Sequence, residues 1–222
     1  MRGLSPILAA ALLLAIPAAS AWAQGDPGRY AECLAQDMST EEAALAAYQS
    51  ALDWQAAGGG AEAKHCAAIA TLRLGYEEEA AARLMDLAET ERFSAPELRG
   101  ELLRQAASAW LLAGILDEAE ETATNAVNAA PGYDTAMLRA RVRMETRDYA
   151  GAETDLGGAL AERPGDVDAL ILRTHAHLGQ GELTAALNDA QAAVEADPQS
   201  VDARLALGDA REAIRTVSSA PD

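Results

Sequence analysis

Small and apolar residues recur along the chain with a spacing of four and then three positions. Residues at this spacing lie on one face of an α-helix, so each such segment predicts a helix with one packed face. The segments are Ala44-Tyr48-Ala51, Ala80-Leu84-Leu87, Ala119-Ala123-Ala126, Ala152-Leu156-Ala159 and Ala186-Ala190-Ala193. Their leading alanines are 36, 39, 33 and 34 residues apart, which predicts one helical unit repeated along the chain.

Glycine and proline stand at fixed distances from these helices. Gly75, Gly114 and Gly181 lie five residues before the leading alanine in three segments, and Ser39 and Arg147 hold the same place in the other two. A proline follows each of the last three segments by five residues: Pro131, Pro164 and Pro198. Glycine permits a tight turn and proline cannot continue a helix, so each unit is expected to be a helix, a turn and a second helix.

These residues resemble the tetratricopeptide repeat, a helix-turn-helix unit of about 34 residues. The resemblance implies an all-α fold, a right-handed α-solenoid of about five repeats plus a C-terminal capping helix. The expected domain covers residues 24–216, followed by a disordered tail over residues 217–222. Its repeats and cap are expected at residues 25–60, 61–98, 99–132, 133–166, 167–200 and 201–215.

The resemblance is uneven along the chain. The last three repeats match well, whereas the first lacks both the turn glycine and the closing proline. An insertion from Arg92 to Pro96 follows the second repeat. Each first helix of the family carries an aromatic residue at one place, which Trp110 and His177 fill here and from which Arg143 departs.

The N-terminal segment has a different pattern, in which the positive charge of Arg2 precedes an apolar run from Ile7 to Ile16. Pro17 ends the run, and Ala21-Trp22-Ala23 supplies small residues before a cleavage point. This order predicts a secretory signal peptide over residues 1–23, cleaved after Ala23, and hence an exported, periplasmic protein. A retained N-terminal anchor is the alternative, although the run is shorter than the roughly 20 apolar residues that span a bilayer.

Charge and composition exclude some classes of partner. The chain has 35 acidic and 17 basic side chains, a formal net charge of −18. Such a surface repels phosphates and anionic lipid headgroups, so we expect no nucleic acid partner and no anionic membrane surface as a partner. No segment after residue 23 is apolar enough to span a membrane, so we expect no membrane insertion after signal cleavage. Aromatic residues make up only 4% of the chain. A core of closely packed, alanine-rich helices is therefore expected rather than one of large side chains.

The chain has two cysteines, Cys33 and Cys66. In an oxidising compartment an even pair indicates one disulfide. The family resemblance implies that first helices of neighbouring repeats lie side by side, where the two thiols can meet. The alternative is a metal or redox site that includes His65. It is disfavoured because adjacent residues point about 100° apart on a helix and no Cys-x-x-Cys motif occurs.

The sequence offers no residues for a catalytic site. It contains no Gly-rich phosphate loop, nucleophile elbow or His-Glu-x-x-His motif. His175 and His177 are two positions apart, so they point about 200° apart around a helix and cannot hold one ion. We therefore predict that the protein is not an enzyme and binds no cofactor or metal.

The family resemblance implies a concave groove lined by the first helices. The candidate groove residues are Arg73, Arg104, Ser108, Leu111, Met137, Arg141, Met144, Ile171, His175 and Leu178. Guanidinium groups bind carboxylates, and Met-rich apolar surfaces adapt to peptides. The hypothesis is a groove that binds an extended or helical peptide through a carboxylate. In the alternative each arginine pairs internally, for example Arg104 with Glu101.

The resemblance implies a periplasmic scaffold or adaptor whose partner is a protein or peptide. The alternative is a chaperone-like assembly helper for secreted or envelope proteins. The pattern predicts no particular oligomeric state.

Overall fold

The computed structural model describes residues 26–219, which form eleven α-helices, one 3₁₀ helix and no strand. The predicted signal peptide lies outside the described residues. The elements are α1 (Pro27–Ala35), α2 (Glu41–Ala56), α3 (Gly60–Arg73), α4 (Glu77–Ala88), η1 (Glu91–Phe93), α5 (Pro96–Leu112), α6 (Leu116–Ala129), α7 (Tyr133–Thr146), α8 (Tyr149–Glu162), α9 (Val167–Gln180), α10 (Leu183–Ala196) and α11 (Val201–Ser218).

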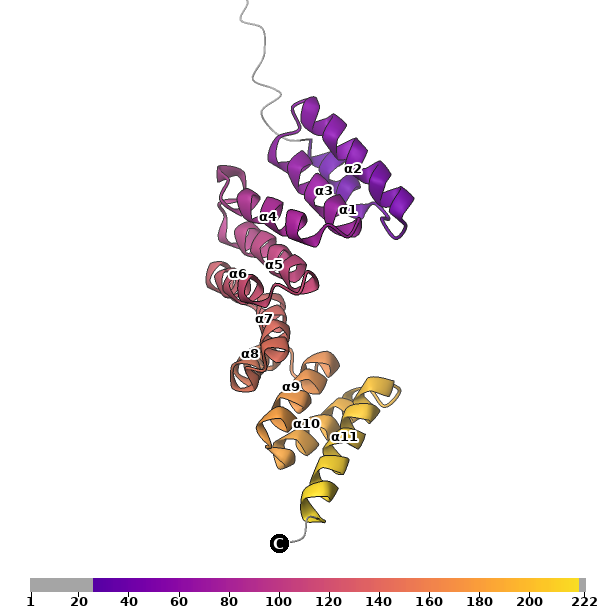
Figure 1. The fold of residues 1–222 in the computed structure, drawn as a ribbon, viewed down its shortest axis with the longest axis vertical. Helices are drawn as coiled ribbons and strands as arrows, with labels where there is room; N and C mark the ends of the chain where they lie inside the picture. Colours follow the sequence, from indigo (N-terminus) through magenta and orange to yellow (C-terminus); the bar gives the residue numbers. More distant parts are fainter. Residues whose placement is uncertain (1–25, 220–222) are drawn as a thin grey trace, which may run out of the picture.

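The helices stack one after another into an elongated array (Figure 1). Consecutive helices pack together from α2 to α11. Helix α9 also contacts both α7 and α11, the helices two places away on either side. We call α1, α3, α5, α7 and α9 first helices and their successors α2, α4, α6, α8 and α10 second helices. Helix α11 then stands where a further first helix would be.

Left-handed backbone conformations form the turns between paired helices. Gly75, Gly114 and Gly181 have φ values of 81°, 73° and 77°, in the region where a side chain is disfavoured. Arg147 occupies the same place in its repeat with a φ of 62° and is the single non-glycine residue with positive φ among residues 26–219. The predicted turns are therefore found at these four residues, whereas Ser39, at the fifth equivalent position, lies between α1 and α2 without a positive φ.

Polar side chains fix where the C-terminal first helices begin. Asp166 accepts a hydrogen bond from the backbone N–H of Ala169 at the start of α9, and Ser200 does the same for Ala203 at the start of α11. Each bond satisfies an N–H group that has no partner within its own helix. Each cap therefore stabilises the first turn of its helix.

The core consists mainly of alanine. The five leading alanines of the sequence pattern are all fully buried: Ala44, Ala80, Ala119, Ala152 and Ala186. Among the few larger side chains that are fully buried are Leu84, Leu102 and Leu156. Small side chains let the helix axes approach closely, so burial is spread along the array rather than gathered at one centre.

The insertion after α4 is a packed element rather than an open loop. It forms η1, whose Phe93 is only 3% exposed and joins the core cluster that contains Leu84 and Leu102. Arg92 forms an ion pair with the buried carboxylate of Glu62. The segment that interrupts the repeat pattern therefore fills space between α3, α4 and α5.

The C-terminal helix is longer than the sequence pattern predicted. Helix α11 runs to Ser218, three residues beyond the expected end of the cap at residue 215. The hydroxyl groups of Thr216 and Ser218 donate hydrogen bonds to the backbone carbonyls of Glu212 and Ile214, four residues earlier in the same helix. A disordered tail from residue 217 is therefore wrong for residues 217 and 218, and residues 220–222 lie outside the described part.

None of the helices within residues 26–219 is both long enough and apolar enough to cross a membrane.

Candidate functional site

An open cavity of about 460 Å³ lies near the C-terminal end of the array. It is lined only by the first helices α7 and α9 and by the capping helix α11. We name it the C-terminal cavity, and its lining residues are Arg141, Asp168, Ile171, Leu172, His175, Asp202, Leu205, Ala206 and Asp209.

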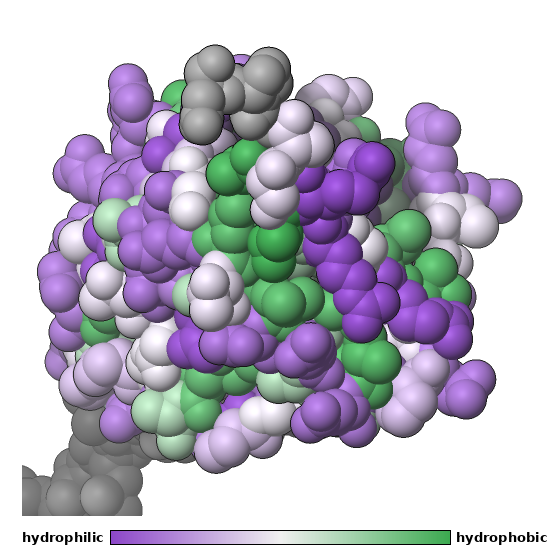
Figure 2. All heavy atoms as spheres, turned by 90° about the horizontal axis from the view of Figure 1, so that it is seen from below, coloured by the Kyte–Doolittle hydropathy of each residue, from purple (hydrophilic) through white to green (hydrophobic). Residues whose placement is uncertain are grey.

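The lining repeats from α9 to α11. Asp168, Ile171, Leu172 and His175 on α9 are each followed 34 residues later by a lining residue of α11. The floor is apolar, and Leu205 is 60% exposed although it is a large aliphatic side chain. Figure 2 views the C-terminal end of the molecule and shows apolar surface there bordered by hydrophilic residues. An exposed apolar floor between polar walls is typical of a binding surface.

The structure brings only part of the predicted groove set together. Arg141, Ile171 and His175 line the C-terminal cavity. Met137 is a correction, because it is only 5% exposed and belongs to the core cluster that includes Leu170 of α9. The remaining candidates do not line this cavity: Arg73, Arg104, Ser108, Leu111, Met144 and Leu178.

Arg104 is held within its own helix. Its guanidinium donates two hydrogen bonds to the carboxylate of Glu101, at 2.6 and 2.8 Å. Burial alone would raise the pKa of Glu101, but hydrogen bonds from Arg104 and Gln105 outweigh burial and hold that pKa below its ordinary value. The internal pairing that the sequence left open is therefore the arrangement found at Arg104.

Two buried ion pairs recur at the repeat period. Arg139 on α7 donates to both carboxylate oxygens of Asp155 on α8, and Arg173 on α9 does the same to Asp189 on α10. In the first pair the Asp155 side chain is 3% exposed, and Arg143 adds a further contact to it at 2.9 Å. These bonds cross-link the two helices within each repeat.

The position that is aromatic in the family pattern lies beside these ion pairs. Arg143 and His177 occupy that place, and each faces the buried aspartate of its own repeat. His177 Nδ1 lies 2.8 Å from a carboxylate oxygen of Glu182, and its Nε2 lies 3.4 Å from Asp189. Glu153 also places a carboxylate oxygen within 4.8 Å of a ring nitrogen of His177 and of a carboxylate oxygen of Glu182. The imidazole of His177 therefore lies among the carboxylates of Glu153, Glu182 and Asp189.

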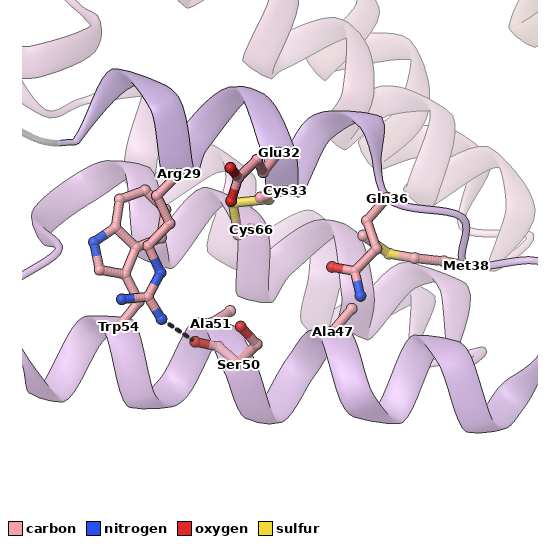
Figure 3. A pocket seen from close by; sticks show the side chains of 10 residues that line it. All are labelled: Arg29, Glu32, Cys33, Gln36, Met38, Ala47, Ser50, Ala51, Trp54 and Cys66. Atoms are coloured by element: carbon pink, nitrogen blue, oxygen red, sulfur yellow. Dashed lines mark hydrogen bonds between the residues drawn. A yellow bond between two sulfur atoms is a disulfide. The ribbon is translucent and has the colours of Figure 1, made fainter.

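A second cavity, of about 300 Å³, lies at the other end between α1, α2 and α3. Cys33 of α1 and Cys66 of α3 form a disulfide in its wall, with their Cα atoms 6.2 Å apart. Figure 3 shows Arg29 beside the ring of Trp54. The central carbon of its guanidinium lies 5.2 Å from the ring centre. One nitrogen of Arg29 also donates to the backbone carbonyl of Ser50. Both cysteines are therefore unavailable as metal ligands or redox thiols in this state.

His65 connects three first helices at this end. Gln105 of α5 donates through its amide nitrogen to Glu101, which leaves its oxygen 2.8 Å from His65 Nε2. An amide oxygen only accepts, so Nε2 carries the proton and donates it. Nδ1 of the neutral ring then accepts a hydrogen bond from the hydroxyl group of Tyr30 on α1. Burial lowers the pKa of His65, although Gln105 and the charge of Glu101 oppose this effect.

This burial predicts that the N-terminal repeats lose stability in mild acid. In the unfolded chain His65 takes up a proton near pH 6.5, its ordinary pKa, whereas the folded protein protonates it only at lower pH. The unfolded chain therefore binds more protons in that window, and the free energy of unfolding falls as the pH drops below 6.5. Urea titrations at about pH 7.5 and about pH 5.5 measure the fall.

The variant His65→Gln should show a smaller fall than the wild type between the two pH values. His175→Gln is the matched control, because the His175 side chain is 41% exposed and lies on α9, outside the N-terminal repeats. An equal fall in His65→Gln and wild type would contradict the assignment to His65.

Known proteins share the repeat pattern and the helical fold of this chain. Residues 137–200 and 173–221 match the family model of the tetratricopeptide repeat. The structure is similar to a tetratricopeptide repeat protein from Parabacteroides merdae, with a TM-score of 0.62 and 20% identity over 78% of this chain and 62% of that one. It is also similar to MamA from Desulfovibrio magneticus RS-1, with a TM-score of 0.58 and 22% identity over 71% and 93% of the two chains.

A third similar structure is the first tetratricopeptide repeat domain of Spaghetti (RPAP3), bound to the HSP90 peptide SRMEEVD. Its TM-score is 0.51 and its identity 22%, over 55% of this chain and 96% of that one. A search of curated proteins gave no match to this sequence.

The chain thus has the all-helical repeat fold that the residue spacing predicted, which confirms the fold class. It carries tetratricopeptide repeats over residues 137–221, and its described part has the solenoid fold of proteins built from such repeats.

Proposed function

We propose that the protein is a scaffold that binds another protein through the C-terminal cavity, and that it works in the periplasm after export. The observation that carries the binding role is the cavity itself, in which first helices and the cap present corresponding side chains to solvent. The peptide complex of the similar Spaghetti (RPAP3) domain supports a protein segment as the ligand. A solenoid offers such a surface because each repeat contacts only the neighbouring repeats and leaves one face open.

Two features support export. The N-terminal residues have the order of charge, apolar run and small residues of a signal peptide. Cys33 and Cys66 form a disulfide, a bond that persists in oxidising compartments such as the periplasm and is rare in the cytosol.

A photo-crosslinking amino acid placed at Leu205 tests both parts of the proposal. Leu205 is exposed in the cavity, so the substitution should leave folding unchanged and place the reactive group against a bound partner. We expect irradiation of cells to yield one discrete crosslinked product, recovered in the periplasmic fraction. Mass spectrometry of that product identifies the partner.

Tyr76 provides the matched control position. It is 60% exposed, like Leu205, but lies at the turn between α3 and α4, outside the C-terminal cavity. Equal crosslinking from both positions would reject the cavity as the binding site. A product found only in the cytosol would reject the periplasmic location.

A further inference from the structure

The walls of the C-terminal cavity carry an excess of negative charge. Three carboxylates line it, Asp168 on α9 and Asp202 and Asp209 on α11, against the single guanidinium of Arg141. Asp168 and Asp202 take part in no ion pair within residues 26–219. Asp209 has only His175 near it, at 4.0 Å. The charge of the cavity is therefore opposite to that of a site for peptide carboxylates.

Helix stability accounts for some of these aspartates but not for all. Asp168 and Asp202 lie in the first turns of α9 and α11, where a negative charge stabilises the helix dipole. Asp209 lies in the middle of α11, where that effect has vanished. Its carboxylate side chain is 65% exposed and faces the same cavity as the other two. A shared ligand explains all three positions.

The apolar floor lies between these carboxylates. Ile171 and Leu172 on α9 are partly buried, whereas Leu205 on α11 is largely exposed. A ligand must therefore offer aliphatic or aromatic side chains to the floor and positive charge to the walls. Both features occur together in an amphipathic segment that carries lysine or arginine.

We infer that the C-terminal cavity binds a basic, amphipathic protein segment, whose apolar side chains contact Ile171, Leu172 and Leu205 and whose cations face Asp168, Asp202 and Asp209. This inference rests on the proposed function and replaces the carboxylate-binding hypothesis drawn from the arginines. Of those arginines, Arg104 is paired with Glu101 and Arg73 does not line the cavity, which leaves Arg141 alone among acidic side chains.

Designed peptides of about 15 residues, roughly four helical turns, test the charge requirement. The first combines leucine and lysine so that the helix is amphipathic, the second has glutamate for lysine, and the third has serine for leucine. Fluorescence anisotropy of labelled peptides measures Kd in about 0.05 M and about 0.5 M salt. We expect the leucine–lysine peptide to bind at least about tenfold more tightly than the other two, with weaker binding at high salt.

A triple variant, Asp168→Asn, Asp202→Asn and Asp209→Asn, tests the residues. It should weaken binding of the leucine–lysine peptide about tenfold or more and reduce the dependence on salt. The matched control is Asp117→Asn, Glu118→Gln and Glu121→Gln on α6, which removes the same charge from exposed positions outside the cavity. Circular dichroism of both variants verifies that the helical array is retained.

The outcomes separate the inference from the proposed function. An equal loss in the two triple variants, or equal binding of the lysine and glutamate peptides, overturns the basic specificity. If the Leu205 crosslink to a partner is still obtained in that case, the proposed binding role stands and only the basic specificity is rejected. Absence of binding for all three peptides together with no crosslink at Leu205 overturns both.

Discussion

Replacing Asp155 with alanine is expected to lower the free energy of unfolding by about 3–5 kcal/mol. The substitution removes a carboxylate that is 3% exposed and leaves the guanidinium groups of Arg139 and Arg143 without it. An unpaired charge held in a low-dielectric interior costs far more than the same charge at the surface. Urea unfolding followed by circular dichroism measures the change as a shift of the midpoint.

The exposed pair of Arg215 and Glu212 supplies the control for this prediction. Its side chains are 75% and 58% exposed, so Glu212→Ala should cost less than about 1 kcal/mol. Asp155→Asn keeps one hydrogen-bond acceptor without the charge. Its loss of free energy of unfolding should lie between those of Asp155→Ala and Glu212→Ala. Equal losses in Asp155→Ala and Glu212→Ala would show that the buried network does not stabilise the repeat.

Removing the disulfide with Cys33→Ser and Cys66→Ala is expected to cost about 3–4 kcal/mol, because the bond closes a loop of 33 residues. The loss should be confined to the N-terminal end. Helix α1 buries none of its side chains fully and is held mainly by the disulfide and by the contacts of Arg29 and Tyr30. Alanine suits position 66, which lies among the buried residues Ala63 and Ala67.

Hydrogen exchange measured by mass spectrometry reads this effect by region. Amides of α1 and its contacts on α3 should exchange faster in the double variant than in the wild type. Those of α9 to α11 should be unchanged, because a repeat array transmits stability mainly between neighbours. Unchanged exchange in α1 would contradict the role of the disulfide as its principal anchor.

Much of the fold follows from local patterns. The spacing of four and three located the packed face of each second helix, because alanine there is buried whatever follows it. The turns were predictable from glycine, and from Arg147 by its place in the repeat. Local spacing says less about how far one repeat covers the next, which depends on contacts between helices far apart in sequence.

Met137 shows why the sequence pattern does not predict which groove positions are exposed. Met137 and Leu205 hold corresponding places, 68 residues or two repeats apart, yet their exposed fractions are 5% and 60%. Met137 has α9 packed beside it, whereas no helix follows α11 within the described residues to cover Leu205. The position of a residue in the array decides whether a groove place is open or covered, and the repeat pattern by itself does not contain that information.

The buried ion pairs were missed for a different reason. Carboxylates are so common in this acidic chain that Asp155 and Asp189 do not stand out in the sequence. A signal was nevertheless present, since Arg139 and Arg173 are 34 residues apart and so are the two aspartates. Two charges of opposite sign that recur together at the repeat period predict a pair that is part of the repeat itself.

The predominance of alanine in the core has a consequence for how this sequence can change over time. An alanine that is fully buried between two helix backbones has no smaller replacement except glycine, and any larger one forces the helices apart. The substitutions that the interior accepts are therefore limited mainly by the maximum size of the new side chain. The outer faces are free of that restriction, so divergence among homologous sequences should concentrate in charge and surface chemistry while the alanine positions stay the same.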